Sequence, residues 1–273
     1  MTGPPVEQSA PRTRTARLDR ALADAHARTV ASLPGGEVHH LGPALLTGSR
    51  TTLRSMNGVF AFDARTFNTL QDERQLDACL AIVSTYDVPW SFNAWAHLGG
   101  PVLVEQLAQR GLVAAGEATA MWRDLVPRKV TGAGYRIEVV RRPAAAREWA
   151  RTLIEVFSMD PALEPVLAAL AGRADEPALL ARVDGEPVGA VAVFGADDVS
   201  ELGFLAVRRA WRGRGLGRRL AHAAEELAAS RGSSAVVTLA PPGGRPLFTA
   251  LDYAAVSTVT FMVCPAPVTA PSA

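Results

Sequence analysis

The sequence predicts an α/β protein in which strands and helices alternate along most of the chain. Apolar residues recur at helical spacing in some segments and form short strand-like runs in others. Asp184-Gly185, between two such runs, is typical of a tight hairpin turn. A glycine-rich turn joins the apolar run 199–207 to an amphipathic segment that begins near Gly215. With 273 residues, 48% of them hydrophobic, the chain can form one large domain or two small ones.

The first half has the periodicity of alternating helices and strands behind a tail at 1–14, which is rich in Pro, Ser and Thr and is expected to be disordered. Pro34-Gly35-Gly36 and Gly111 are stop signals for two of the helices. Helices are predicted over 15–33, 72–86 and 101–110, and strands over 38–46, 55–62, 90–96 and 118–125.

The second half follows an expected linker at 127–134 and ends in an expected tail at 265–273. Its strands are predicted over 135–140, 179–183, 188–194, 199–207, 235–239 and 254–263, and its helices over 143–157, from Asp160-Pro161 onward, 215–230 and 246–251. The order strand, helix, strand, helix, strand over 55–125 repeats in this half. An internal duplication follows as a hypothesis.

Composition excludes several classes of function. The formal net charge is +1 and the arginines are spread along the chain, which argues against a nucleic-acid surface. Cys79 and Cys264 are isolated and the histidines lack a partner set, so no metal site or disulfide framework is expected. Without an apolar leader or a run long enough to span a bilayer, we expect a cytoplasmic protein that does not bind membranes.

The turn after strand 199–207 has the chemistry of an anion site. A helix start leaves backbone N–H groups without partners and is partly positive. Glycines there remove the Cβ atoms that would keep a large anion away, and arginines add charge. The turn has neither the lysine of a Walker loop nor the last glycine of a dinucleotide fingerprint. The sequence of the turn is Arg212-Gly213-Arg214-Gly215-Leu216-Gly217.

Arg212, Gly215 and Gly217 form the pattern Arg-x-x-Gly-x-Gly between a strand and a helix, which resembles the acetyl-CoA loop of the GNAT superfamily of N-acyltransferases. The resemblance covers roughly 135–263 and implies a mixed central sheet flanked by helices, with 135–264 as the acetyl-CoA-binding catalytic domain. The usual last strand of such a domain is missing there or cannot be separated from its neighbours. Residues 15–126 resemble a degenerate, truncated copy, because Asp63 to Asn68 lacks the basic glycine turn. The fold expected is therefore two tandem GNAT-like domains.

The resemblance also implies how acetyl-CoA is held. Its pyrophosphate takes the amides from Arg212 to Gly217, with Arg218 close by. The pantetheine arm pairs with unpaired backbone groups of Leu205, Ala206 and Val207, because the central strand and its neighbour splay apart in this family. The amide of Val207 is the expected donor to the thioester carbonyl. The side chain of Leu216 is expected to pack the helix onto the sheet.

Glu201 is the candidate general base, because an amine must lose its proton before it can attack a thioester. Simple strand alternation places it on the same face as Gly203, Leu205 and Val207. The alternative is that Glu201 lies at the solvent-exposed start of the strand, beside Asp197 and Asp198. The family's usual tyrosine acid is replaced by Phe248, and Tyr253 is interpreted as packing.

Candidate substrate residues lie on the turn between the first two helices of the second half: Phe157, Met159 and Asp160. Asp160 could pair with a cationic amine, but a helix N-cap is the favoured interpretation. Trp90, Asn93 and Trp95 could line a pocket, but the interface between the halves is the favoured interpretation.

The resulting hypothesis is an N-acetyltransferase that moves an acetyl group to the amine of a small molecule, by direct attack in a ternary complex, as a monomer or homodimer. A non-catalytic protein that binds CoA is an alternative that Phe248 keeps open. Another is the same fold with other chemistry, either O-acyl transfer or thioester decarboxylation.

Overall fold

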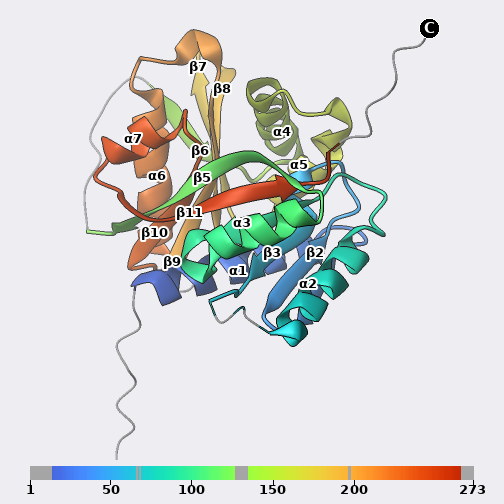
Figure 1. Ribbon diagram of the computed structural model, residues 1–273. Helices are drawn as coiled ribbons and strands as arrows, with labels where there is room; N and C mark the ends of the chain where they lie inside the picture. Colours follow the sequence, from blue (N-terminus) through green and yellow to red (C-terminus); the bar gives the residue numbers. More distant parts are fainter. Residues whose placement is uncertain (1–13, 66, 68, 127–134, 196–197, 266–273) are drawn as a thin grey trace, which may run out of the picture.

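The sheet of the computed structural model contains eleven strands among the described residues, which are 14–65, 67, 69–126, 135–195 and 198–265 (Figure 1). The predicted linker and most of both predicted tails lie outside these ranges; Arg14, counted with the tail, begins the first helix. The first-half strands are β1 (Glu37–Leu41), β2 (Ala44–Gly48), β3 (Gly58–Phe62), β4 (Ser91–Trp95) and β5 (Val113–Asp124). The second-half strands are β6 (Arg136–Val139), β7 (Ala178–Val183), β8 (Glu186–Phe194), β9 (Val199–Val207), β10 (Ala235–Ala240) and β11 (Ala254–Val263).

The helices lie close to the predicted segments. They are α1 (Arg14–Ala31), α2 (Leu70–Val83), α3 (Gly100–Gln109), α4 (Pro143–Phe157), α5 (Glu164–Ala171), α6 (Leu216–Ser230) and α7 (Arg245–Thr249). The start of α4 follows from its local sequence. Pro143 occupies the first turn of α4, where its missing N–H costs nothing. Among the described residues, no helix is both long and apolar enough to cross a membrane.

The two halves exchange strands at the centre of the sheet. The strand order is β1-β2-β3-β4-β11-β5-β10-β9-β8-β7-β6, so β11 lies between β4 and β5, and β5 lies between β11 and β10. Figure 1 shows β5 and β11 side by side in the middle of the molecule. Each half thus receives from the other the strand that its own segment lacks. This is why 135–263 contains one strand fewer than the resemblance implies.

Each half also repeats the same local order. The units β3-α2-β4-α3-β5 and β9-α6-β10-α7-β11 correspond element by element. The pairs β3·β4 and β9·β10 are parallel, and the two units meet through the antiparallel pair β5·β11. This arrangement supports the hypothesis of an internal duplication.

The prediction of one strand over 38–46 was wrong. The segment forms a hairpin, β1 and β2, in which Leu41 pairs with Ala44. Gly42 adopts the left-handed region (φ +55°) and Pro43 follows it, and this turn reverses the chain inside an otherwise continuous strand pattern.

Helix α1 packs across the joint between the halves. Ala25, Val30 and Leu33 are buried in one core cluster with Trp149 of α4 and Leu167 of α5. Toward the other end of α1, Leu18 and Leu22 belong to a cluster that contains residues of β4, β5, β10 and β11. Helix α1 of the first half therefore packs beside α4 and α5 of the second half and over the central strands of the sheet.

Candidate active site

Strands β9 and β10 separate after a short parallel contact. Ala235, Val236 and Val237 pair with Val199, Ser200 and Glu201, and beyond them β10 pairs with β5 on its other side while β9 keeps β8. The hydroxyl of Thr238 donates to the carbonyl of Leu202 at 2.9 Å, at the point where the strands part. The expected splay is therefore present in the described residues.

The backbone of Val207 faces the open edge of β9. Val207 lies opposite Gly189, and the amide of Arg208 donates to the carbonyl of Val188 at 3.0 Å, which makes the Val207 pair a non-hydrogen-bonded one. The N–H and C=O of Val207 then point away from β8. By the same alternation, Ala206 is turned toward β8, so it contributes less to this edge than Val207.

A β-bulge interrupts β9 near its middle. Ala192 pairs with Gly203 but Ala190 pairs with Ala206, which leaves one extra residue on β9. Phe204 occupies the left-handed region (φ +53°), which is rare for an aromatic residue, and packs edge-on against Trp149 at 5.8 Å between ring centroids.

The bulge reverses the faces of the strand. Leu202, Leu205 and Val207 all pack in the cluster beneath α6. Phe204 and Ala206 pack in the cluster beneath α4. Glu201 precedes Leu202 and points to the opposite face from it. The prediction that Glu201 shares a face with Leu205 and Val207 was therefore wrong, because it assumed an unbroken strand.

The glycine-rich turn is open to solvent. Gly215 is the N-cap of α6 (φ +79°), with no side-chain cap and no acidic residue in the first turn. Gly213 is also left-handed (φ +74°), and a Cβ placed on either glycine would meet nothing within 4 Å. Arg212, Arg214 and Arg218 are exposed beside them. The first amides of α6 are consequently free of side-chain caps and bordered by positive charge.

Local contacts hold this turn in place. The Nε of Arg212 donates to the carbonyl of Val207 at 3.0 Å, which ties the turn to the end of β9. Tyr135 donates its hydroxyl to the carbonyl of Arg214 at 3.0 Å, and the guanidinium of Arg214 lies over the ring of Trp211 at 4.9 Å. Leu216, the first residue of α6, is buried in the core between this helix and the sheet, as expected.

The equivalent region of the first half is closed. The N-terminus of α2 is satisfied by a capping box, in which Thr69 accepts from the amide of Asp72 and Asp72 accepts from the amide of Thr69. Where β3 parts from β4, the buried indole of Trp95 donates to the carbonyl of Phe60 at 2.8 Å. These contacts place a carboxylate and a bulky ring where the second half has free amides and an open edge.

Glu201 has the electrostatics of a group that titrates near neutral pH. Burial raises the pKa of its carboxyl to about 7, and the negative charge of Glu176 adds to the effect. The side chain is half-buried, and among the described residues no hydrogen bond or ion pair is formed by its carboxylate.

The three predicted substrate residues do not converge. Asp160 accepts a hydrogen bond from the amide of Ala162 at 2.9 Å, so it is the N-cap of the turn Pro161–Leu163. Met159 packs against the core beneath α4, whereas Phe157 is 43% exposed at the end of α4. Sequence reasoning missed Glu176, which has no motif around it.

Phe248 and Tyr253 pack against each other in the core, with ring centroids 5.1 Å apart. The hydroxyl of Tyr253 donates to Glu225 at 2.8 Å, and burial raises its pKa well above the usual value. The interpretation of Tyr253 as packing is confirmed.

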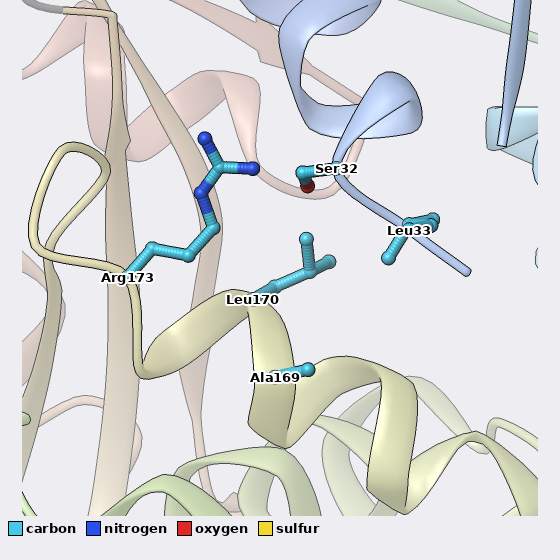
Figure 2. A pocket seen from close by; sticks show the side chains of 5 residues that line it. All are labelled: Ser32, Leu33, Ala169, Leu170 and Arg173. Carbon is cyan, nitrogen blue, oxygen red and sulfur yellow. The ribbon is translucent and has the colours of Figure 1, made fainter.

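A small cavity lies away from the glycine-rich turn (Figure 2). Its volume is about 210 Å³, below the range of roughly 300 Å³ and more that is usual for small-molecule sites. It is lined by Ser32, Leu33, Ala169, Leu170 and Arg173, none of which belongs to β9 or to the turn.

Comparison with known proteins agrees with this geometry. Residues 143–245 match the family model described as Acetyltransferase (GNAT) family. No curated protein sequence matches the chain. A GCN5-related N-acetyltransferase from Kribbella flavida is 19% identical, with 90% of this chain and 95% of that chain covered and a TM-score of 0.63.

Two other solved structures match at similar length. A GCN5-related N-acetyltransferase from Sphaerobacter thermophilus is 17% identical, with 94% of this chain and 93% of that chain covered and a TM-score of 0.59. A functionally unknown conserved protein from Staphylococcus epidermidis ATCC 12228 is 14% identical, with 83% and 93% covered and a TM-score of 0.57. These matches extend over both halves, so they show that the whole chain shares this fold.

Proposed function

We propose that this chain, whose second half is a domain of the GNAT acetyltransferase family, transfers an acetyl group from acetyl-CoA to the amine of a small molecule by direct attack in a ternary complex. The observation that carries the proposal is the open, uncapped start of α6 beside the free edge of β9.

The pyrophosphate of acetyl-CoA fits the glycine-rich turn. The amides from Gly213 to Gly217 offer donors, and the space where Cβ atoms would stand at Gly213 and Gly215 is empty. Arg212, Arg214 and Arg218 supply compensating charge. In the first half the capping carboxylate of Asp72 would repel the same group, so we assign acetyl-CoA to the second half alone.

The thioester lies, in this proposal, along the open edge of β9. The N–H of Val207 points to that edge and would donate to the carbonyl oxygen as negative charge develops on it. The amine nitrogen forms a bond to the carbonyl carbon, the carbon–sulfur bond breaks, and the thiolate of CoA leaves. A thiol has a pKa of about 8.5, so the thiolate can leave without a dedicated acid, which the buried Phe248 does not provide.

Glu201 takes the proton that the amine loses. Its raised pKa of about 7 leaves a large ionised fraction at neutral pH together with a strong affinity for a proton. Because Glu201 lies on the opposite face of β9 from Leu205 and Val207, we assign the transfer to a bridging water. Glu201 approaches from the face covered by α1 and α4, and we place the acceptor on that side.

The test combines binding with product analysis. Calorimetric titration with acetyl-CoA should show one site per chain, and thiol release should appear when acetyl-CoA is incubated with a panel of small primary amines. Mass spectrometry should find a product heavier by one acetyl group on nitrogen. Binding without thiol release in any member of the panel would favour the non-catalytic alternative. An O-acetylated or decarboxylated product would favour the third hypothesis.

A further inference from the structure

Glu176 is a buried carboxylate that the proposed mechanism does not use. It is 2% exposed and lies between α5 and β7, just before Pro177. The carbonyl of Pro177 accepts from the amide of Val193 at 2.9 Å, which places Glu176 beside Phe194 at the end of β8. Phe194 is also the residue that pairs with Glu201 on β9. Two carboxylates thus flank one residue of β8.

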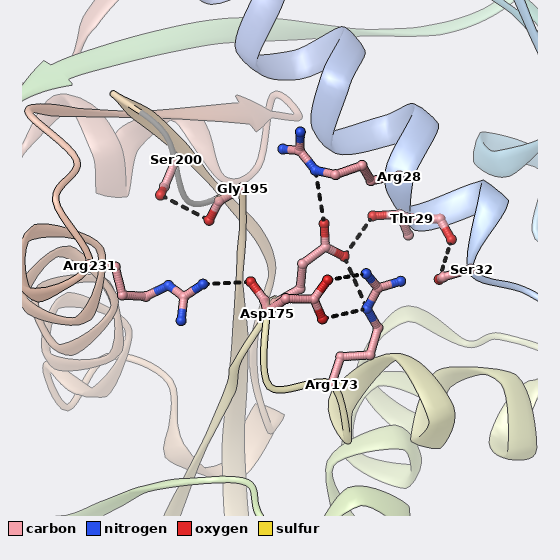
Figure 3. Close-up of polar contacts among 9 residues, drawn as sticks. Arg28, Thr29, Ser32, Arg173, Asp175, Gly195, Ser200 and Arg231 are labelled. Carbon is pink, nitrogen blue, oxygen red and sulfur yellow. Dashed lines mark hydrogen bonds and ion pairs between the residues drawn. The ribbon is translucent and has the colours of Figure 1, made fainter.

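The groups that hold Glu176 come from both halves (Figure 3). The hydroxyl of Thr29 in α1 donates to its Oε2 at 3.1 Å, and the Nε of Arg28 lies 3.9 Å from its Oε1. From the second half, the Nε of Arg173 lies 3.7 Å from Oε2. Arg28 also reaches the end of β8, since its Nη2 would lie 3.4 Å from a Cβ on Gly195, the residue after Phe194.

These partners neutralise Glu176 only in part. Arg173 is engaged by Asp175, whose oxygens accept from its Nε at 3.1 Å and from its Nη2 at 2.5 Å. Arg28 is 43% exposed, which weakens its ion pair by solvent screening. Burial raises the pKa of Glu176 above its usual value in spite of both arginines. Arg231, the C-cap residue of α6, donates to the backbone carbonyl of Asp175 at 2.7 Å.

We infer that Glu176, fixed by Thr29 of the first half, is a positioning residue for the proposed acyl transfer: it holds a second carboxylate near Glu201, so that Glu201 keeps its affinity for the proton of the acceptor amine. The role in transfer rests on the proposed function. The inference gives the first half a part in the active centre, because the hydroxyl that orders Glu176 comes from α1.

The physical basis is the repulsion between like charges. When Glu176 is ionised, a second negative charge on Glu201 is disfavoured, so Glu201 holds its proton to higher pH. The two groups then titrate as a coupled pair. Removing the charge of Glu176 should shift the titration of Glu201 to lower pH. Removing the Thr29 hydroxyl should act in the same direction and more weakly, because it destabilises the ionised form of Glu176.

The experiment is a carbon-13 NMR titration of the full chain, labelled at the glutamate carboxyl carbon, without acetyl-CoA or acceptor. Glu201→Gln and Glu176→Gln assign the two signals. We expect a midpoint of about 7 for Glu201 in the unmodified chain, a lower midpoint in Glu176→Gln, and a smaller decrease in Thr29→Val. Glu176→Asp, which keeps the charge, should retain a raised midpoint.

Ser32→Ala is the matched control. It removes a hydroxyl from the end of the same helix, but that hydroxyl donates to the backbone carbonyl of Thr29 and not to Glu176. Its Glu201 midpoint should equal that of the unmodified chain. If Glu176→Gln fails to fold by circular dichroism, Thr29→Val and Glu176→Asp decide the question. An unchanged midpoint in the folded variants overturns the inference.

A second measurement separates this inference from the proposed function. The pH profile of kcat/KM for thiol release, with acetyl-CoA and an amine from the panel, should move to lower pH in Glu176→Gln together with the NMR midpoint. If the midpoint moves and the profile does not, Glu201 is not the base and the role of Glu176 in transfer is overturned. Binding of acetyl-CoA, measured alongside, would still report on the glycine-rich turn.

Discussion

Arg123 of β5 donates from its Nη1 to Oε1 of Glu225 in α6 at 3.0 Å, and both side chains are 8% exposed. The same glutamate accepts from the hydroxyl of Tyr253, and its Oε2 lies 3.0 Å from Nδ1 of His222. The first half thus places a charged residue inside the core of the second, where its exchanged strand enters the sheet.

Arg123→Ala should destabilise the chain by about 3 kcal/mol or more, because it leaves the Glu225 carboxylate buried without its cation. Replacing both partners, as in Arg123→Met with Glu225→Leu, should cost much less. Arg14→Ala is the control, since its pair with Asp124 is exposed and should contribute less than about 1 kcal/mol. Urea unfolding followed by fluorescence measures all of these differences.

Gly215→Asp should reduce acetyl-CoA binding at least tenfold, because a carboxylate would stand against the pyrophosphate. Gly185→Asp is the matched control: Gly185 is also left-handed (φ +86°), also has nothing within 4 Å of an added Cβ, and lies in the β7–β8 turn. Both variants carry the same backbone strain, so calorimetric titration isolates the electrostatic effect. Equal affinities in the two variants would contradict the assignment of the pyrophosphate site.

Glu201→Gln should bind acetyl-CoA normally and lose the pH dependence of acetyl transfer near neutrality. In the unmodified chain, turnover should rise as pH increases through about 7, where Glu201 becomes ionised. The variant should be slower by ten- to a hundredfold above that pH and closer to the unmodified chain below pH 6, where Glu201 is protonated. A parallel pH profile in both proteins would remove Glu201 from the mechanism.

The same substitution should stabilise the fold at high pH. The folded pKa of Glu201 is raised from 4.5 to about 7, so its contribution to stability is present below pH 4.5 and is lost as pH rises through 7. Glu201→Gln should therefore raise the Tm at pH 8, with a gain in unfolding free energy of up to about 3 kcal/mol. At pH 4 the two proteins should melt at similar temperatures. Differential scanning calorimetry at both values of pH makes the comparison.

A chain cut between residues 127 and 134 should fold only when both pieces are present. Each piece alone would expose the strand edges that normally pair with β5 or β11. We expect insoluble or unfolded fragments when they are expressed singly, and a stoichiometric complex when they are expressed together. Size-exclusion chromatography distinguishes these outcomes, and a folded, monomeric second-half fragment would contradict the expectation.

Local sequence signals were sufficient for most elements of the fold. The helix opened by Pro143, the hairpin at Asp184-Gly185 and the strand 199–207 lie where their patterns predicted, because each depends on neighbours within a few residues. The glycine-rich turn was found for the same reason, since its residues are consecutive.

Features that depend on distant pairing were not visible in the sequence. The apolar pattern of 113–124 does not show that β5 lies between β11 and β10. The same pattern would allow β5 to pair with strands of either half. The bulge at Phe204 was missed because an aromatic residue gives no warning of a left-handed backbone. Glu176 was missed because it comes close to Glu201 only through the pairing of β7, β8 and β9, which the sequence does not show.

The strand exchange has a consequence for how the protein is made. The chain emerges from the ribosome from its N-terminus onward. Strands β4 and β5 therefore cannot pair with β11, which lies between them, until residues 254–263 have been translated. Neither half of the sheet can be completed before that point. Until then, the unpaired edges of β4 and β5 in the nascent first half have to be shielded from other chains.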